Sequence, residues 1–479
     1  MIYLRDDYIR LFESVTAQQP LVVSPLPSAG SIRRYYRITS EGHSLVGTFN
    51  ENISENEAFF EFANGLRSIG VRVPEVYQIS SDRKFYLQTD LGDTNLFQLI
   101  TDDQARVSEA QLRAWLYEAV RMLALIQCRA GEQVNFERSW PNATYSTKTI
   151  LDDLYYFKYY FLKMFPNFVF NEYDLDADLQ RFAILLASVP SEFFMYRDFQ
   201  SRNIMVYQDQ LWFIDFQGAR KGPLQYDIVS LLYQTKAAIP EAVRNDAIDV
   251  YITSLRQYID PDSLSFRKFL PYFVFFRLLQ VMGAYGYRGL IQKRPHFLRS
   301  IPFALRSLED QLQHTPLKTE FPYLYDVLKR LLDIDLPNIP VSHNRGELHI
   351  TLSSFSYKDG GIPIDYSGNG GGHVFDCRPL PNPGREEAFK RMTGKDKEVV
   401  AYLDSQEVVA KFFEHITQLL NLSIENYIER NFDNLMVSFG CTGGQHRSVY
   451  MAEKTFQWIH EHFPQLSITL EHHVLQKQK

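Results

Sequence analysis

The chain has 479 residues, of which 45% are hydrophobic and 22% charged, and its net charge is −7. One hydrophobic core stops growing at about 250–300 residues, so the length predicts two or three domains. The composition excludes a disordered or fibrous chain, and the acidic balance argues against a chain coated along its length by nucleic acid.

Membrane and secretion signals are not evident in the sequence. The first residues, MIYLRDDYIRLF, carry charges where a signal peptide would need an apolar stretch. No uninterrupted run of about 18 apolar residues occurs, so we expect no membrane-spanning helix and no membrane partner. Three widely spaced cysteines, Cys128, Cys377 and Cys441, predict neither a disulfide framework nor a cysteine-based zinc site. Together these features favour a cytoplasmic protein.

The first two thirds of the chain predict two lobes. A small β-rich lobe over residues 1–95 is expected from strands at 21–26, 33–40, 44–50 and 84–92 and a helix at 55–70. A helical lobe over 96–335 is expected from helices at 108–127, 149–165, about 179–188, 242–258 and 266–289, with a β-rich insert at 193–219. We therefore predict an α+β two-lobed, protein-kinase-like fold in this part.

A separate, small α/β domain is predicted at 347–479. The segment 336–346, rich in proline, glycine and polar residues, is the expected linker. After it, strands are expected at 347–357, 373–380, 435–440 and 467–475, and helices at 397–419, 422–430 and 448–463. Strands that alternate with helices are typical of α/β domains.

The most specific motif is YRDFQSRN followed by IDFQ, which places Asp198, Asn203 and Asp215 in order on loops between apolar strands. Phosphoryl transfer needs a group that orients the attacking hydroxyl and oxygen ligands for Mg²⁺ on the phosphates. Asp198 is the predicted catalytic base, and Asn203 and Asp215 are the predicted magnesium ligands. Single Asp and Asn residues commonly cap turns, but the ordered set favours catalysis.

This motif resembles the catalytic loop of the aminoglycoside/choline phosphotransferase-like kinases, with Tyr196 where that family usually has His. Within that group, the chain most resembles the anomeric sugar kinases of the AmgK type, which phosphorylate N-acetylmuramate and N-acetylglucosamine at C1. The stretches that carry this resemblance are SIRRYYR, LGDTNL, RDFQSRN, IDFQGARKGPLQYDIVSLL and FFRLLQVMGAYGYRGL. The resemblance implies ATP and Mg²⁺ as cofactors and an amino sugar as acceptor. It also implies cell-wall sugar recycling as the pathway.

The resemblance implies roles for further residues. Asp227 corresponds to a buried carboxylate that braces the catalytic loop. The implied nucleotide site comprises Ser28, Gly30, Arg33, Arg34, Thr89 and Leu91. The strand SLVGTFN has no Lys for the nucleotide phosphates, so Arg33 and Arg34 are candidates for that task. For the sugar, Asp153, Tyr156 and Arg277 are the predicted contacts, although salt bridges and helix packing are alternative roles for them.

A second motif, VSFGCTGGQHRSVYMAE, predicts a strand, a glycine-rich turn and a helix. Free N–H groups at a helix start favour anions, and His446 and Arg447 add cationic donors. Cys441 to Arg447 also fits the C-x5-R pattern of cysteine phosphatases, and a simple tight turn is a further alternative.

The wider context of this motif, with VFDCRPLPNP and RMTGKDKEV, resembles the C-terminal domain of RapZ proteins over about 346–476. That resemblance implies binding of a sugar phosphate such as glucosamine-6-phosphate, and it makes RNA a further candidate partner and self-association an expectation. The implied sugar-phosphate site comprises Asp376, Cys441, Thr442, Gly443, Gly444, His446 and Arg447.

The leading hypothesis is therefore an ATP- and Mg²⁺-dependent amino-sugar kinase joined to a sugar-phosphate-binding domain. One alternative is a kinase for aminoglycosides, choline or another small alcohol. The other alternative is a regulatory sensor of nucleotides or sugar phosphates with an RNA-binding C-terminal domain.

Overall fold

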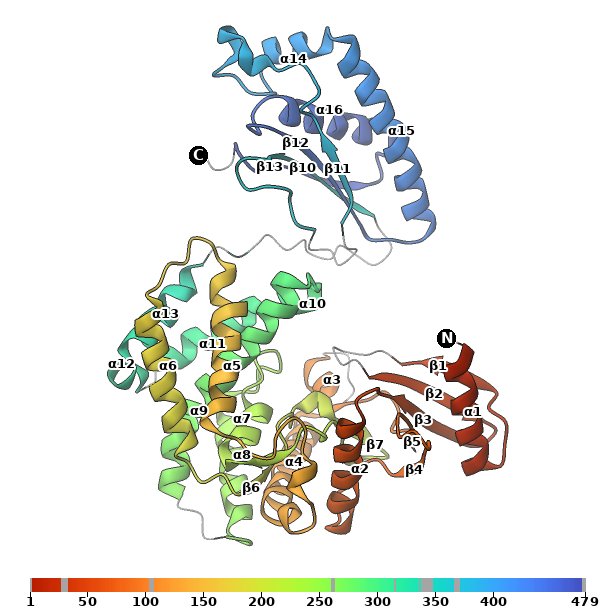
Figure 1. Cartoon of the computed structure of the whole chain (residues 1–479), viewed down its shortest axis with the longest axis vertical. Coiled ribbons are helices and arrows are strands. Elements are labelled where there is room, and N and C mark those ends of the chain that lie inside the picture. The colour runs from red at the N-terminus through yellow and green to blue at the C-terminus, as the bar shows by residue number, and fades with distance from the viewer. Residues whose placement is uncertain are drawn as a thin grey trace. The chain divides into compact units, whose positions relative to one another are not determined.

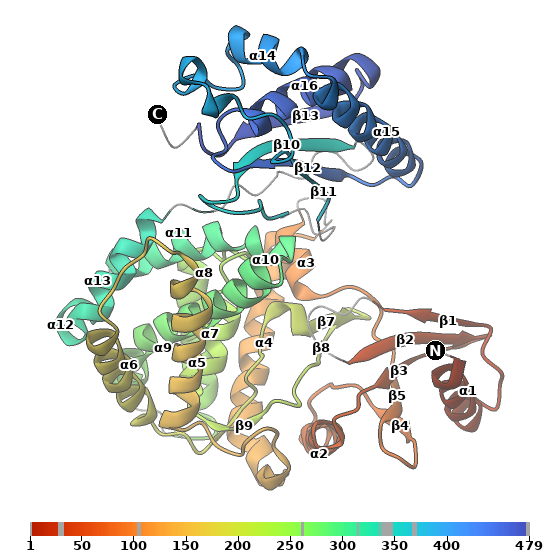
Figure 2. The same cartoon turned by 45° about the horizontal axis from the view of Figure 1, so that its top comes forward.

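The structure is a computed structural model with two compact units (Figures 1 and 2). It describes residues 2–26, 33–102, 107–259, 263–313, 316–334, 336, 348–365 and 371–475. One unit comprises Met1–Ala284 and Ser300–Ile334, and the other comprises Tyr285–Arg299 and Asp335–Lys479. Apart from residue 336, the predicted linker at 336–346 lies outside the described residues, so the domain boundaries stay predictions.

The N-terminal lobe is built on one antiparallel sheet in the order β1-β2-β3-β5-β4. Its strands are β1 (Val22–Pro25), β2 (Arg34–Ser40), β3 (His43–Phe49), β4 (Val76–Ile79) and β5 (Phe85–Thr89). Strands β1, β2, β3 and β5 match the predicted ones. The four-residue strand β4 was not predicted.

Two helices, α1 (Ile2–Thr16) and α2 (Ile53–Ser68), cover opposite faces of this sheet (Figure 1). Tyr8 and Phe12 of α1 pack with Ile38, Leu45 and Leu87 of the strands. On the other face, the ring of Tyr86 lies 5.3 Å from Phe59 and 5.0 Å from Phe60 of α2. Because side chains alternate along a strand, every second residue of β2 and β3 faces α2.

The second lobe is mainly helical, as predicted. Its longer helices are α4 (Glu109–Arg129), α5 (Thr147–Tyr160), α6 (Glu172–Ala187), α7 (Leu224–Leu232), α8 (Glu241–Leu255), α9 (Ser263–Tyr285), α11 (Ile301–Gln313) and α13 (Pro322–Arg330). The short helices α3 (Leu96–Thr101) and α12 (Leu317–Glu320) complete it. The short helix α10 (Pro295–Leu298) belongs instead to the compact unit that comprises Tyr285–Arg299 and Asp335–Lys479.

The predicted β-rich insert forms two small antiparallel pairs within the helical lobe. Strand β6 (Phe193–Met195) pairs with β9 (Arg220–Gly222), and β7 (Ile204–Tyr207) pairs with β8 (Gln210–Phe213). The motif residues 196–203 and 214–219 are the connections between these strands, so the insert brings both loops of the motif to one place.

One segment passes a membrane-span test by length and composition alone. Among the described residues, Phe266–Ile291 is long enough and, with a mean hydropathy of 1.2, apolar enough to cross a membrane, which is weak evidence for a span. Of its most apolar 18-residue stretch, 61% is buried, as in the core helix of a globular protein. Charged residues such as Arg277 interrupt this apolar segment.

The C-terminal domain is an α/β fold with a parallel sheet in the order β11-β12-β10-β13. Its strands are β10 (His349–Ser356), β11 (His373–Asp376), β12 (Asn434–Cys441) and β13 (Ser467–His472). Its helices are α14 (Lys397–Asp404), α15 (Glu407–Glu429) and α16 (Arg447–His462). The predicted combination of a β-rich lobe, a helical lobe and a separate α/β domain is confirmed.

The helix boundaries before β12 differ from the prediction. We expected one helix at 397–419 and another at 422–430, but the break lies at Ser405–Gln406 and α15 continues through 422. Buried Leu420 and Ile424 keep α15 in register against the core, which outweighs the polar residues around Asn421.

Candidate functional site

The predicted catalytic loop of the kinase-like unit is held by a buried carboxylate. Asp227 on α7 has no exposed surface and accepts hydrogen bonds from the backbone N–H of Tyr196 at 2.7 Å and of Arg197 at 2.8 Å. Gln127 Nε2 donates to the same carboxylate at 3.1 Å. Burial raises the pKa of Asp227 to about 7, whereas these hydrogen bonds lower it. Asp227 thus braces the loop on which Asp198 lies.

The three motif residues come together around Asn203. Its Nδ2 donates to the backbone oxygen of Asp198 at 2.8 Å and to Asp215 Oδ2 at 3.1 Å. Gln217 Nε2 donates to Asp215 Oδ1 at 2.7 Å. Burial raises the pKa of Asp215, and the nearby charge of Asp198 adds to that effect. Two close carboxylates that repel each other favour a bound cation.

The donor set at Asn203 and Asp215 fits magnesium. With its Nδ2 engaged by Asp215, Asn203 keeps its amide oxygen as a ligand, and Asp215 supplies a carboxylate. In the described part of the chain, no three His, Cys, Asp or Glu side chains gather into a metal site. Mg²⁺ commonly takes only one or two protein carboxylates, with phosphates and water completing its shell. When bound, such an ion would neutralise charge on the phosphates.

A polar cluster from α5 and α9 lies beside Asp198. Arg277 Nη2 is 3.7 Å from Asp198 Oδ1, and Arg277 also contacts Gln280. Gln280 Nε2 donates to Asp153 Oδ2 at 2.6 Å, which connects α9 to α5. Tyr226 on α7 donates to Gln280 Oε1 at 2.7 Å. Two of the three predicted sugar contacts, Asp153 and Arg277, are therefore joined through Gln280.

The charge around Asp153 is predominantly positive. Burial raises the pKa of Asp153, and the charges of Arg197, Arg277 and Arg220 act against that rise. Burial and the charge of Arg197 lower the pKa of Arg220 to about 10. Three mostly buried guanidinium groups thus act on one carboxylate, an arrangement that the sequence motif did not indicate.

Tyr156, the third predicted sugar contact, takes part in packing. Its ring lies 4.7 Å from that of Tyr160, and it closely approaches Gly283 of α9, where an added Cβ would lie 2.9 Å from Tyr156 Cδ1. The absence of a side chain at Gly283 therefore lets α5 and α9 approach each other and brings Asp153 within reach of Gln280.

The predicted nucleotide residues fall into three groups. Ser28 and Gly30 lie outside the described residues. Thr89 ends β5, where its Oγ1 accepts from the backbone N–H of Glu75 at 2.9 Å, and buried Leu91 follows. Arg33 and Arg34 diverge: Arg33 is buried beside α2, whereas exposed Arg34 has its guanidinium 5.8 Å from the ring of Phe49.

In the C-terminal domain, the predicted phosphate loop connects β12 to α16. Its glycines allow a tight path: Gly444 has φ +67°, and a Cβ there would lie 2.4 Å from Val474. In the part of the chain that the structure describes, the backbone N–H groups from Gly443 to Ser448 donate no hydrogen bond. Such a run of unpaired donors at a helix start is an anion-binding arrangement.

Arg447 is the buried cation of this loop. It is 6% exposed, and its Nη1 donates to the backbone oxygens of Arg378 at 2.8 Å and of Leu380 at 3.1 Å, which leaves Nε without a partner. A hollow of about 460 Å³ adjoins it, lined by Arg378, Pro379, Leu380, Pro381, Asn382, Arg385, Val408, Thr442 and Arg447. Arg378, Asn382 and Arg385 were missed, although the run CRPLPNPGR places two arginines in a proline-rich turn.

Other predicted residues of this site have structural contacts. His446 Nε2 donates to the backbone oxygen of Phe389 at 2.9 Å. Cys441 is buried with its Sγ 3.1 Å from Ser448 Oγ. Asp376 pairs with Arg378 at 2.7 Å, and that guanidinium lowers the pKa of Asp376. Of the predicted set, Thr442 and Arg447 line the hollow.

Comparison with curated proteins finds relatives of the C-terminal part. The chain is 42% identical over 114 residues to a nucleotide-binding protein of Methylobacillus flagellatus, which is 24% of this chain and 39% of that protein. It is 34% identical over 181 residues to a nucleotide-binding protein of Bacillus velezensis, or 37% of this chain and 59% of that protein. The chain thus spans about two fifths to three fifths of the length of these relatives.

Solved structures similar to the kinase-like unit include choline kinase LicA from Streptococcus pneumoniae, with a TM-score of 0.44 at 10% identity, covering 65% of this chain and 100% of that one. Amicoumacin kinase hAmiN, solved in complex with AMP-PNP, Ca²⁺ and Ami, has a TM-score of 0.43 at 16% identity. The match covers 69% of this chain and 92% of that one.

Family models match both units. The RapZ C-terminal domain model matches residues 348–476, in agreement with the resemblance of the second motif. The phosphotransferase enzyme family model matches residues 22–266, which include the loop-bracing Asp227 and all three residues of the first motif. Because that match spans just over half of the chain, the chain belongs to the phosphotransferase enzyme family.

Proposed function

We propose that the phosphotransferase unit transfers the γ-phosphoryl group of ATP, with Mg²⁺, to the anomeric hydroxyl of an amino sugar such as N-acetylmuramate or N-acetylglucosamine. Asp198 would accept the hydroxyl proton, and Asn203 and Asp215 would hold the ion. Arg33, Thr89 and Leu91 would face the nucleotide. The proposal includes a cytoplasmic role in cell-wall sugar recycling.

The observation that carries the acceptor class is the contact between Arg277 and Asp198 at 3.7 Å. It brings the Asp153, Gln280 and Arg277 cluster to the catalytic carboxylate. Carboxylate, amide and guanidinium groups side by side are suited to bind sugar hydroxyls and an acidic substituent. A choline or aminoglycoside acceptor is cationic. The three arginines around Asp153 would repel it, so they disfavour this class of acceptor.

A transfer assay with ATP, Mg²⁺ and a panel of acceptors tests this proposal. The panel is N-acetylmuramate, N-acetylglucosamine, glucosamine, kanamycin and choline, and the product is identified by NMR. A sugar-1-phosphate supports the proposal. Transfer to kanamycin or choline alone would show that the acceptor is a cationic alcohol and not an amino sugar of the proposed class. ATP binding without any product would favour the regulatory alternative.

Asp153 provides a sharper test of the acceptor site. Asp153→Asn is expected to raise the acceptor KM at least about 10-fold, because a charge-assisted hydrogen bond contributes about 1.5–3 kcal/mol. The matched control is Asp152→Asn, since Asp152 is exposed on the same helix and pairs only with Lys148 in the described contacts. Equal acceptor KM values for the two variants would remove Asp153 from the site.

We propose as a second function that the C-terminal domain binds a sugar phosphate. The unpaired N–H groups from Gly443 to Ser448 and the buried guanidinium of Arg447 support a phosphate site at the hollow. Arg378 and Arg385 would meet the rest of the ligand. RNA binding has no comparable support: His472, near the basic end, is engaged by Ser354 and Glu453, and residues 476–479 lie outside the described residues.

Calorimetry with glucosamine-6-phosphate tests this site. Arg447→Gln is expected to weaken binding about 10–100-fold through the loss of a charged donor. Because Arg447 also holds two backbone oxygens, Arg385→Gln is the second variant, expected to weaken binding without altering the loop. Arg430→Gln, an exposed change outside the lining, is the control. Wild-type binding by both Arg447→Gln and Arg385→Gln would contradict the assignment.

A further inference from the structure

Arg197 lies next to the predicted base Asp198 and has a backbone conformation that favours glycine. Its φ is +76°, in the left-handed region where the Cβ of an L-residue crowds the backbone. The Arg197 N–H donates to Asp227 Oδ1 at 2.8 Å, so that carboxylate holds the backbone of this residue. Because strained residues cluster at active sites, we expect the long cationic side chain of Arg197 to serve the site.

The two neighbouring arginines are held by the protein itself. Arg277 Nη2 lies 3.7 Å from Asp198 Oδ1, whereas Arg220 Nε and Nη2 both donate to the backbone oxygen of Gly218 at 3.3 Å. Arg197 passes the same loop, since an added Cβ at Gly218 would lie 3.6 Å from Arg197 Cδ. Within the described part of the chain, the Arg197 guanidinium has no hydrogen bond and no ion pair. The residue is only partly buried, so these donors are accessible to a ligand.

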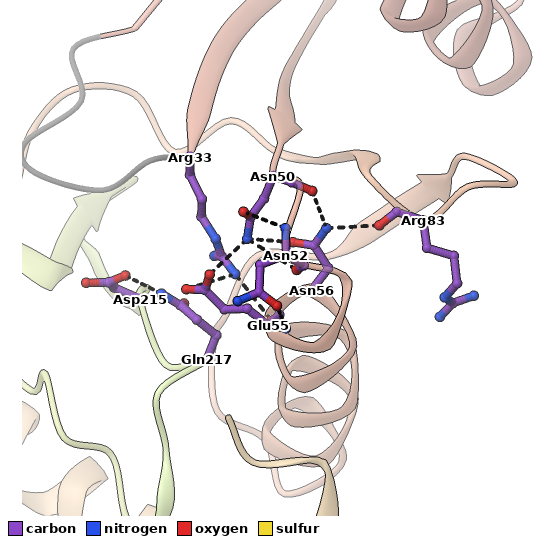
Figure 3. A network of polar contacts seen from close by, with 8 residues as sticks. All are labelled: Arg33, Asn50, Asn52, Glu55, Asn56, Arg83, Asp215 and Gln217. Carbon is purple, nitrogen blue, oxygen red and sulfur yellow. Dashed lines mark hydrogen bonds and ion pairs between the residues drawn. The ribbon is translucent and has the colours of Figure 1, made fainter. Parts of the chain in front are cut away.

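A fourth arginine, Arg33, belongs to the predicted ion site. Figure 3 shows it paired with Glu55 beside Asp215 and Gln217, and Arg33 Nη2 lies 3.6 Å from Glu55 Oε1. Burial raises the pKa of Asp215, and the charge of Arg33 acts against that rise. The cation near the predicted magnesium ligands is therefore already engaged by a protein carboxylate.

Arg197 interacts instead with the predicted acceptor site around Asp153. Burial acts to lower the pKa of Arg197, but nearby charges, Asp198 first and Asp153 among the others, raise it above its ordinary value. The guanidinium groups of Arg197, Arg220 and Arg277 act on the two carboxylates of Asp153 and Asp198. One positive charge thus has no counter-charge among these groups, and an anionic ligand group would supply it.

We infer that the guanidinium of Arg197 binds an acidic substituent of the acceptor and so selects acidic over neutral sugars. This inference rests on the proposed transfer to an amino sugar, and it names the acidic members of that class as the preferred acceptors. The planar fork of an arginine matches the two oxygens of a carboxylate. A glycine at position 197 would relieve the backbone but would leave no cation for that group.

Steady-state transfer to N-acetylmuramate and to N-acetylglucosamine tests this inference, because only the former carries a carboxylate. The full chain is used with saturating ATP and Mg²⁺. Arg197→Gln is expected to lower kcat/KM for N-acetylmuramate about 10–100-fold and to change that for N-acetylglucosamine less than about threefold. Arg197→Lys should keep part of the preference, since it retains the charge but not the fork. The control is Arg129→Gln, at an exposed residue that ends α4 and pairs with Glu132.

Arg197→Gly separates a binding role from a structural one. Glycine adopts a positive φ without strain, so this variant should have a Tm no lower than that of wild type. It should nevertheless lose the preference for N-acetylmuramate to the same extent as Arg197→Gln. A clearly lower Tm with equal losses for both acceptors would overturn the inference and make Arg197 a packing residue.

The remaining outcomes distinguish this inference from the proposed function. Equal losses of kcat for both acceptors in a folded Arg197→Gln would overturn the inference and assign the guanidinium to the transferred phosphoryl group, which both reactions share. An unchanged ratio of the two kcat/KM values in Arg197→Gln and Arg197→Gly would overturn it and leave the proposed transfer intact. If Arg197→Gln does not fold, Arg197→Gly and Arg197→Lys decide by the same ratio. No product from either sugar with the wild-type chain would overturn the proposed function together with this inference.

Discussion

Asp198→Asn is expected to lower kcat for phosphoryl transfer by about 10²–10⁴-fold, the usual contribution of a positioned general base. The backbone beneath Asp198 is pinned by Asp227 and Asn203, so an amide at this position keeps the loop geometry but cannot take the hydroxyl proton. Steady-state kinetics with saturating ATP and the acceptor identified from the panel measures this loss.

Asp209→Asn is the matched control, because Asp209 is an exposed residue in the turn between β7 and β8 of the same insert. Its kcat should stay within about twofold of wild type, as for most surface changes. An Asp198→Asn variant that folds and keeps more than about a tenth of the wild-type kcat would remove Asp198 from the role of base.

Asp227→Ala is expected to destabilise the phosphotransferase unit by about 3 kcal/mol or more, because each buried donor left without an acceptor costs about 1–3 kcal/mol. The donors are the backbone N–H groups of Tyr196 and Arg197 and the Gln127 amide. Thermal unfolding should show a Tm lower by roughly 6–12 °C. Asp227→Asn keeps one acceptor oxygen, so its Tm should fall less. Equal Tm values for wild type and Asp227→Ala would contradict the bracing role.

The pH dependence of this difference has a defined sign. The pKa of Asp227 is raised to about 7 in the folded chain, so the folded state binds more protons than the unfolded state between the ordinary carboxyl range and pH 7. The stability that Asp227 contributes is therefore present at low pH and is lost as the pH rises toward 7. The difference in unfolding free energy between wild type and Asp227→Asn should shrink from pH 5 to pH 8.

The proximity of Asp198, Asn203 and Asp215 could be predicted because these residues are close in the sequence. Asp198, Asn203 and Asp215 lie on two connections of one small insert, and the hairpin of β7 and β8 between them brings the loops together. Asp227 follows on the next helix. Where few residues separate the partners, the order and spacing of residue types already restrict the geometry.

The cluster of Asp153, Gln280 and Arg277 and the placement of Arg33 both depend on long-range packing. Asp153 meets Gln280 because α5 and α9 approach closely at Gly283, and Arg277 reaches Asp198 from the same helix. A resemblance pointed to Asp153 and Arg277, but not to Arg197 and Arg220, the other two arginines that act on Asp153. Similarly, Arg33 and Arg34 are adjacent and chemically identical in the sequence, and only their opposite directions from β2 distinguish them.

The sequence by itself determined the order of a β-rich lobe, a helical lobe and an α/β domain. It also determined the segment that brings Asp198, Asn203 and Asp215 together and the glycine-rich loop before α16. These features rest on local periodicity and short spacing. Only the tertiary structure decided which arginines approach a carboxylate, that Arg378 and Arg385 join Arg447 around one hollow, and that α15 continues through 422. The physical reason is that burial and charge pairing depend on elements distant in the chain, and these contacts outweigh local preference.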